Sequence, residues 1–149
     1  MSLPPSPPVD LEAERATLGA LLLDREAILV IAPFLTPEHF ALEKHGAIYA
    51  AILACAGLRE PPDLATVSAE LRRRGRLELV GGVSALGELA SAMPTAVHVE
   101  YYARIVERAA VGRALIETAG RIAALGFDDQ RPIEERLDAL CRNVYRADG

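Results

Sequence analysis

The sequence predicts an all-α protein, made of a compact helical head followed by a hairpin of one long helix and one shorter helix. Apolar residues recur at spacings of three, four and seven in almost every segment, which is the period of a helix with one buried face. No segment alternates apolar and polar residues with the period of two that a half-buried strand requires. The 149 residues are 51% hydrophobic and 25% charged, as in a globular domain with its own core.

Prolines and capping residues divide the first two thirds of the chain into short helices. Residues 1–9 are rich in proline and predict an extended lead-in, after which Asp10 is placed to cap the first helix. Pro33, Gly75 and the pair Gly81-Gly82 mark later helix ends and turns. We expect the head to occupy about 10–93, with further helices starting near residues 24, 37, 43, 64 and 83.

The last third of the chain predicts the hairpin, over about 96–146, so that head and hairpin together fill residues 10–146. Residues 96–125 lack proline and predict one helix of about 30 residues, roughly 45 Å long. A turn follows at residues 126–129, and Pro132 opens the last helix. Gly112 and Gly120 interrupt the long helix, each at a cost of about 1 kcal/mol relative to alanine. Either a neighbouring helix approaches closely at these glycines, or they mark a kink or simple tolerance.

Net charge and hydropathy indicate which classes of ligand are unsuited to this chain and in which compartment it is found. The net charge of −5 argues against nucleic acid or an anionic membrane as the main ligand, because both select for clustered positive charge. No apolar run approaches the roughly 18 to 20 residues that cross a bilayer, and the N-terminus lacks the pattern of a signal peptide. We therefore expect a soluble, cytoplasmic protein with no membrane partner.

Motifs of catalysis are missing from the sequence. The only lysine, Lys44, is followed by His45 and lies outside any GxxxxGK[ST] loop, and there is no GxGxxG, HExxH or CxxC. The arginines between Arg72 and Arg76 fit a solvated helix end better than a phosphate site. No catalytic, cofactor-binding or metal-binding residue is predicted, and the chain by itself is not expected to be an enzyme.

Histidine and cysteine are interpreted as structural. His39, His45 and His98 do not have the spacing of metal ligands, and no acidic or cysteine cluster completes a site around them. Cys55 and Cys141 lie in helical apolar patterns, which favours reduced thiols in the core over a disulfide.

These patterns favour a function in binding other protein chains. Tyr101, Tyr102, Ile105 and Val106 place large apolar groups on more than one side of the long helix. Such surplus apolar surface is typical of a subunit interface, which we predict at these four residues. The alternative is that the head simply covers them.

A series of motifs resembles one known family. The early motifs are Pro7-Pro8, Leu11-Glu12-Ala13-Glu14, Leu18-Gly19-Ala20-Leu21-Leu22-Leu23-Asp24 and Phe34-Leu35-Thr36-Pro37-Glu38-His39-Phe40. The later ones are the segment 45–52, Pro62-Asp63-Leu64-Ala65-Thr66-Val67, Gly81-Gly82-Val83, Leu86, Glu88-Leu89-Ala90, Pro94-Thr95-Ala96 and Val99-Glu100-Tyr101-Tyr102-Ala103-Arg104-Ile105-Val106. Together they cover nearly all of residues 7–146, and their order resembles the N-terminal domain of bacterial replicative DNA helicases of the DnaB type.

The resemblance implies a fold, an assembly and a set of partners. In that family a helical head carries a hairpin, the hairpins pair the domains into dimers, and three dimers form a collar on a hexameric ring. The family unwinds duplex DNA with a RecA-like motor that binds ATP and magnesium, and we expect that motor in a domain absent from this chain. The collar also docks the C-terminal domain of primase, a helicase loader is a possible further partner, and contact with DNA is made through the ring.

The resemblance also assigns docking residues. It implies that Glu12, Ile116 and Ile122 contact primase, although both isoleucines also fit a hairpin core. The family often has an aromatic residue at the position of Ala85, so a contact made there is lost or replaced in this chain. Two other interpretations remain open: a free-standing helical adaptor without a motor, and a small enzyme that uses acidic residues in a helical pocket.

Overall fold

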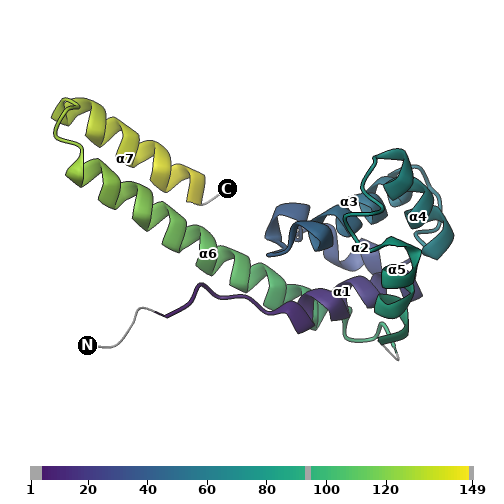
Figure 1. Ribbon diagram of the computed structural model, residues 1–149. Coiled ribbons are helices and arrows are strands. Elements are labelled where there is room, and N and C mark those ends of the chain that lie inside the picture. Colours follow the sequence, from purple (N-terminus) through teal and green to yellow (C-terminus); the bar gives the residue numbers. More distant parts are fainter. Residues whose placement is uncertain (1–4, 93–94, 148–149) are drawn as a thin grey trace. The chain divides into compact units, whose positions relative to one another are not determined.

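The computed structural model describes residues 5–92 and 95–147, and within them it is all-α, as predicted (Figure 1). The break predicted at Met93 and Pro94, the end of the head at residue 93 and the first residues of the lead-in lie outside the described residues. The elements are α1 (Leu11–Leu23), α2 (Ala27–Ile31), the 3-10 helix η1 (Pro37–His39), α3 (Glu43–Gly57), α4 (Leu64–Arg73), α5 (Gly82–Ala92), α6 (Val99–Phe127) and α7 (Ile133–Ala147).

The chain divides into two compact units. One unit, the head, holds residues 9–110, and the other, the hairpin, holds residues 111–149 together with residues 1–8. The helix α6 contributes to both, because the division falls between Ala110 and Val111 in its first half.

A single core holds the head together. Leu18 and Leu21 of α1, Ile48 and Ile52 of α3, and Val106 of α6 are all almost fully buried in it. Each such side chain contributes roughly 1.5–3 kcal/mol by leaving water. The N-terminal half of α6 is therefore part of the head core rather than a free arm.

Buried polar groups in the head have partners. The Tyr49 hydroxyl donates to the Leu35 carbonyl at 2.8 Å, and burial raises the pKa of Tyr49 to about 12. Glu14 lies under the surface, where Oε1 is 2.8 Å from His45 Nδ1 and Oε2 accepts the Ala41 amide at 2.8 Å. This network ties α1 to α3, so His45 has the packing role that was expected for it.

Capping residues begin the helices where the sequence predicts them. The Asp10 carboxylate accepts the Ala13 amide at 2.9 Å and caps α1. Asp63 and Thr66 form a reciprocal capping box at the start of α4, with 3.0 Å between donor and acceptor in each direction. Each such cap is worth about 1 kcal/mol.

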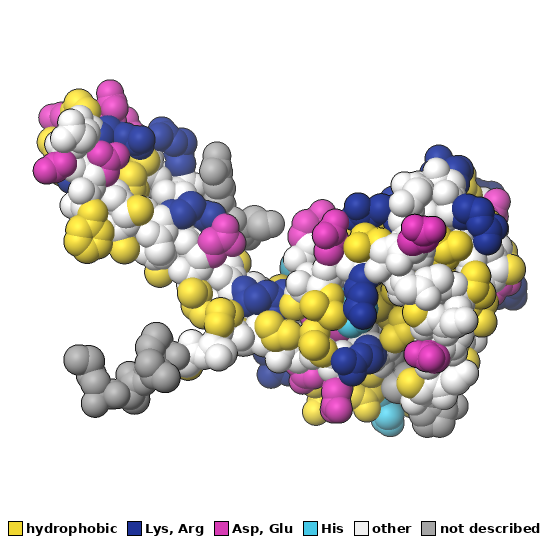
Figure 2. All heavy atoms as spheres, viewed as in Figure 1, with side chains coloured by type: hydrophobic (Ala, Val, Ile, Leu, Met, Phe, Trp, Pro, Cys, Tyr) yellow, Lys and Arg dark blue, Asp and Glu magenta, His cyan; other side chains and the backbone are white. Residues whose placement is uncertain are grey.

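The hairpin has almost no core of its own. Among its described side chains only Thr118 and Ala139 are buried. Polar contacts link its two helices: Arg121 Nε donates to Asn143 Oδ1 at 3.2 Å, and Arg136 donates to the Leu125 carbonyl at 3.3 Å. Figure 2 shows a row of hydrophobic side chains along the exposed edge of α6 in this unit.

The two cysteines do not behave alike. Both are free thiols, as expected, and Cys55 is buried in α3. Cys141 is exposed on α7, so its predicted core role is wrong. Of the apolar residues near it on α7, Leu137 and Val144 are 54% and 48% exposed.

Candidate interaction surfaces

The described residues hold no cluster of three or more metal-binding side chains. The buried carboxylate of Glu14 is already engaged by a histidine ring and a backbone amide. No helix in the described part of the chain is both long enough and apolar enough to cross a membrane. The described residues also form hollows, two of them in the head and one in the hairpin.

Two arginines at the end of α4, Arg73 and Arg74, share the carboxylate of Glu70. Glu70 accepts from Arg73 at 2.6 Å and from Arg74 at 2.7 Å, and these contacts lower the pKa of Glu70 to about 2. Arg76 donates to Glu43 at 3.1 Å. Two carboxylates, Glu70 and Glu43, thus offset part of the charge of the four arginines between Arg72 and Arg76.

A groove on the head brings together a residue predicted to contact primase and residues predicted to form a subunit interface. It has a volume of about 610 Å³ and lies between α1 and the start of α6. Glu12 contributes to its wall from α1, while Tyr101, Tyr102 and Ile105 contribute from α6. The two tyrosine rings stand edge to face, 5.4 Å apart, and Tyr101 is 63% exposed. We call this feature the head groove.

Val106 lies behind the head groove rather than in it. Its side chain is 1% exposed and packs in the head core. It supports the turn of α6 that carries Tyr102 and Ile105, but it has almost no surface of its own to offer a partner.

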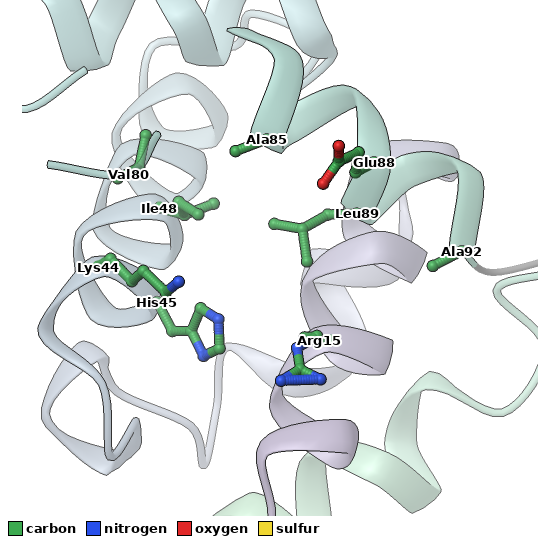
Figure 3. A pocket seen from close by; sticks show the side chains of 9 residues that line it. All are labelled: Arg15, Lys44, His45, Ile48, Val80, Ala85, Glu88, Leu89 and Ala92. Atoms are coloured by element: carbon green, nitrogen blue, oxygen red, sulfur yellow. The ribbon is translucent and has the colours of Figure 1, made fainter. Parts of the chain in front are cut away.

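A second hollow in the head lies between α1, α3 and α5 (Figure 3). Its volume is about 260 Å³, and the short side chain of Ala85 forms part of its wall. Arg15, Lys44 and Glu88 place charged groups around it. The sequence drew attention to Ala85, but the charged residues come from three helices and could not be grouped without the fold.

The hairpin exposes an apolar surface at its two helices. Ile116 is 51% exposed on α6, and Leu137 is 54% exposed on α7. Ile122 is half-buried and lines a small apolar hollow of about 170 Å³, together with Ile133 and Leu137. Both isoleucines that the sequence singled out thus have surface available to a partner, and neither is fully enclosed in a core.

The hairpin hollow also contains an arginine with an unusual environment. Arg136 lines the hollow and donates to the Leu125 carbonyl near the end of α6, which places a cation beside the negative end of that helix. Its Nε is the one buried side-chain polar atom without a hydrogen-bond partner among the residues described. No sequence signal distinguishes this arginine from its neighbours.

A comparison with known protein families assigns a family to the chain. A model of the DnaB-like helicase N-terminal domain matches residues 6–108, which is more than half of the chain. The chain belongs to the family of DnaB-like helicase N-terminal domains.

Curated relatives of this DnaB-like domain are longer proteins. The replicative DNA helicase DnaB of Geobacillus stearothermophilus is 48% identical over 138 residues, which make up 93% of this chain and 30% of that protein. The replicative DNA helicase DnaC of Bacillus subtilis is 42% identical over the same shares. The chain thus spans about 30% of the length of these relatives.

Solved structures share the fold of this DnaB-like domain. The N-terminal domain of DnaB helicase from Mycobacterium tuberculosis has a TM-score of 0.90 at 39% identity, over 95% of this chain and 99% of that one. A DnaB-like replicative helicase, described with its interactions with primase, has a TM-score of 0.72 at 28% identity, over 90% of this chain and 31% of that one.

Proposed function

We propose that this chain is the collar-forming and primase-docking domain of a hexameric replicative helicase that unwinds duplex DNA at the replication fork. Family membership and the uncovered apolar surface of the hairpin support the proposal. In it, residues 10–146 act as one functional domain, in which the short helices at about 10–93 are followed by the pair of helices at about 96–146, with a lead-in at 1–9. ATP and magnesium are bound outside this chain, whose single lysine lies in no phosphate-binding loop.

The small number of buried side chains in the hairpin supports self-association. In the described part of the hairpin unit only Thr118 and Ala139 are buried, which leaves most of its apolar side chains in water. A second copy that packs its own hairpin on this surface removes those groups from solvent, and a stable interface of this kind buries about 1,200–2,000 Å². The resulting dimers are the unit from which a trimer of dimers builds the collar.

The head groove supplies a second contact in the assembly. Tyr101, Tyr102 and Ile105 present aromatic and branched surface there, and Val106 holds their helix turn in place from behind. Tyrosine is enriched at interface centres because its ring buries a large area with little loss of side-chain freedom.

Primase docking uses the surfaces that carry Glu12, Ile116 and Ile122. Glu12 is exposed at the head groove, Ile116 stands on the open face of α6, and Ile122 lines the hairpin hollow. A partner with apolar side chains for the isoleucines and a basic group for Glu12 matches them. The family often has an aromatic residue where this chain has Ala85, so a primase contact made by that ring is lost or replaced here.

The mechanism is geometric rather than catalytic. Paired hairpins hold the diameter and symmetry of the ring, and the outer faces of the collar present the docking surface. Primase influences unwinding if it binds one arrangement of the collar more tightly than another, because only a difference in affinity shifts such an equilibrium.

A helicase loader is a further partner of the parent ring, and direct binding of this acidic chain to DNA is weak.

Sedimentation equilibrium across protein concentration tests the self-association. We expect a dimer, or a dimer that grows to a hexamer. Leu137→Lys places a charge on the hairpin surface and weakens dimerisation at least about tenfold. Leu29→Lys is the matched control, because Leu29 is also exposed but lies on α2 in the head. A monomer at every concentration contradicts collar formation by this domain alone.

Isothermal titration with the C-terminal domain of the cognate primase tests the docking. Glu12→Lys and Ile116→Ser are expected to weaken binding by about tenfold or more, while Leu29→Ser leaves it unchanged. Absence of binding to any oligomer of the wild-type chain contradicts the docking function. A reading frame that ends without a GxxxxGK[ST] motif would instead favour a free-standing adaptor.

A further inference from the structure

Pro8, in the described part of the lead-in, contacts α6 of the hairpin unit at Gly112 and Arg113. We call residues 5–8, Pro5-Ser6-Pro7-Pro8, the strap. A Cβ atom placed on Gly112 would lie 2.7 Å from Pro8 Cγ, a separation that real Cβ atoms essentially never show. The neighbouring Arg113 donates from its guanidinium to the Pro8 carbonyl at 2.9 Å. The absence of a side chain at Gly112 and the hydrogen bond from Arg113 thus both hold Pro8 against α6.

Gly112 lowers the stability of the helix, and the close contact with the strap gives a reason for a glycine there. Glycine inside a helix is less favourable than alanine by about 1 kcal/mol. Gly120, eight residues further along the same helix, has no atom within 4 Å of its hypothetical Cβ, so no close approach accounts for it. At Gly112 the neighbour is a proline ring of the strap.

The strap reaches α6 on the same side as Ile116. Residues 112 and 116 are four apart and therefore share a helix face. Thr118, which is buried, points roughly 120–160° away from them at about 100° per residue. The side of α6 that carries the strap is thus distinct from the side that is enclosed within the hairpin, and Ile116 is half-exposed on it.

We propose that the strap is part of the primase-docking surface and that Gly112 is the residue that positions it. The inference rests on the proposed docking function. Prolines keep a segment extended and without backbone donors, and extended proline segments bind to apolar, aromatic-lined grooves of partner proteins. The primase domain that covers Ile116 also contacts the strap, whose residues 5–8 are all exposed.

The test compares two glycine substitutions in one helix. Gly112→Ala displaces the strap, because the new methyl group would lie too close to the ring of Pro8. Gly120→Ala leaves the strap in place. A chain that begins at Val9 removes the strap without altering α6. Each is titrated with the C-terminal domain of the cognate primase, and sedimentation is measured alongside to follow dimerisation.

We expect wild type and Gly120→Ala to bind equally, while Gly112→Ala and the shortened chain bind at least about fivefold more weakly with unchanged dimerisation. Unchanged or tighter binding by both of these, with normal binding by wild type, overturns the role of the strap and leaves the docking function standing. No binding by any of the four chains overturns both proposals.

Discussion

Two helices of the head end with the same hydrogen bonds but with different residues in the left-handed position. At the end of α3 the Glu60 amide donates to the Cys55 carbonyl at 2.9 Å, and Arg59 adopts φ of +59°. At the end of α4 the Arg76 amide donates to the Leu71 carbonyl at 2.8 Å, and Gly75 adopts φ of +68°. Glycine is the residue that tolerates this conformation without a clash of its Cβ.

The contrast predicts a stabilising substitution. Arg59→Gly removes the steric cost of the left-handed backbone, only part of which is offset by the greater freedom of glycine in the unfolded chain. We expect the free energy of unfolding to rise by about 0.5–1 kcal/mol, while Gly75→Ala lowers it by a similar amount. Urea denaturation of both variants measures these changes. A loss of stability in Arg59→Gly would show that the arginine side chain makes a compensating contact.

The carboxylate of Glu70 predicts a pH dependence in the acid range. Hydrogen bonds from Arg73 and Arg74 lower its pKa from the ordinary 4.5 to about 2. The folded protein therefore binds fewer protons than the unfolded chain between these values, and the stabilisation is complete above about pH 4.5 and lost as the pH falls toward 2. We expect the stability difference between wild type and Glu70→Gln to shrink over that range. A difference that stays constant down to pH 2 would contradict the assignment.

Sequence patterns predict residues whose role is local and miss those whose role depends on the fold. Asp10, Asp63 and Gly75 cap helices through neighbours within a few residues, so their roles could be predicted from spacing alone. The pairing of Glu14 with His45 joins residues 31 positions apart, and no local signal reveals it. The exposure of Cys141 was missed because an apolar stripe does not show whether anything in the chain covers it.

At the scale of elements, α6 offers two glycines in different surroundings. Gly120 is exposed with no neighbour near its hypothetical Cβ, so Gly120→Ala gains helix propensity without a clash. We expect a rise of about 0.5–1 kcal/mol in the free energy of unfolding. Gly112→Ala gains the same propensity but must displace Pro8, so its net gain is smaller or absent. Thermal denaturation of the two variants side by side measures the difference, and equal gains would mean that the strap contact is worth nothing.

The long helix itself was well predicted, but its division between two units was not. The absence of proline over residues 96–125 agrees with an observed helix at Val99–Phe127. The periodic pattern continues without a break past Ala110, although the residues before that point pack in the head and those after it do not. Periodicity reports which face of a helix is apolar, whereas the partner that covers the face is set by tertiary structure.

At the scale of the whole molecule, burial is distributed unequally. Almost all large, fully buried side chains belong to the head, while the described part of the hairpin buries only Thr118 and Ala139. Local opening of a segment requires less free energy where few apolar contacts are lost. In a single copy, the hairpin should therefore open far more often than the head, and pairing with a second copy should suppress that opening.

Hydrogen exchange as a function of protein concentration tests this difference. We expect slow exchange in α1 and α3 at every concentration, because their amides exchange only when the head unfolds. Exchange in α7 should depend on the free monomer, whose fraction falls with the inverse square root of concentration in a tight dimer. About a hundredfold increase in concentration then slows α7 about tenfold. Leu137→Lys, which weakens pairing at least about tenfold, should speed exchange in α7 at least about threefold at a given concentration without changing α1 or α3. Slow exchange in α7 that is independent of concentration in both chains would show that the two helices are stable without a partner, and the collar would then need another source of its symmetry.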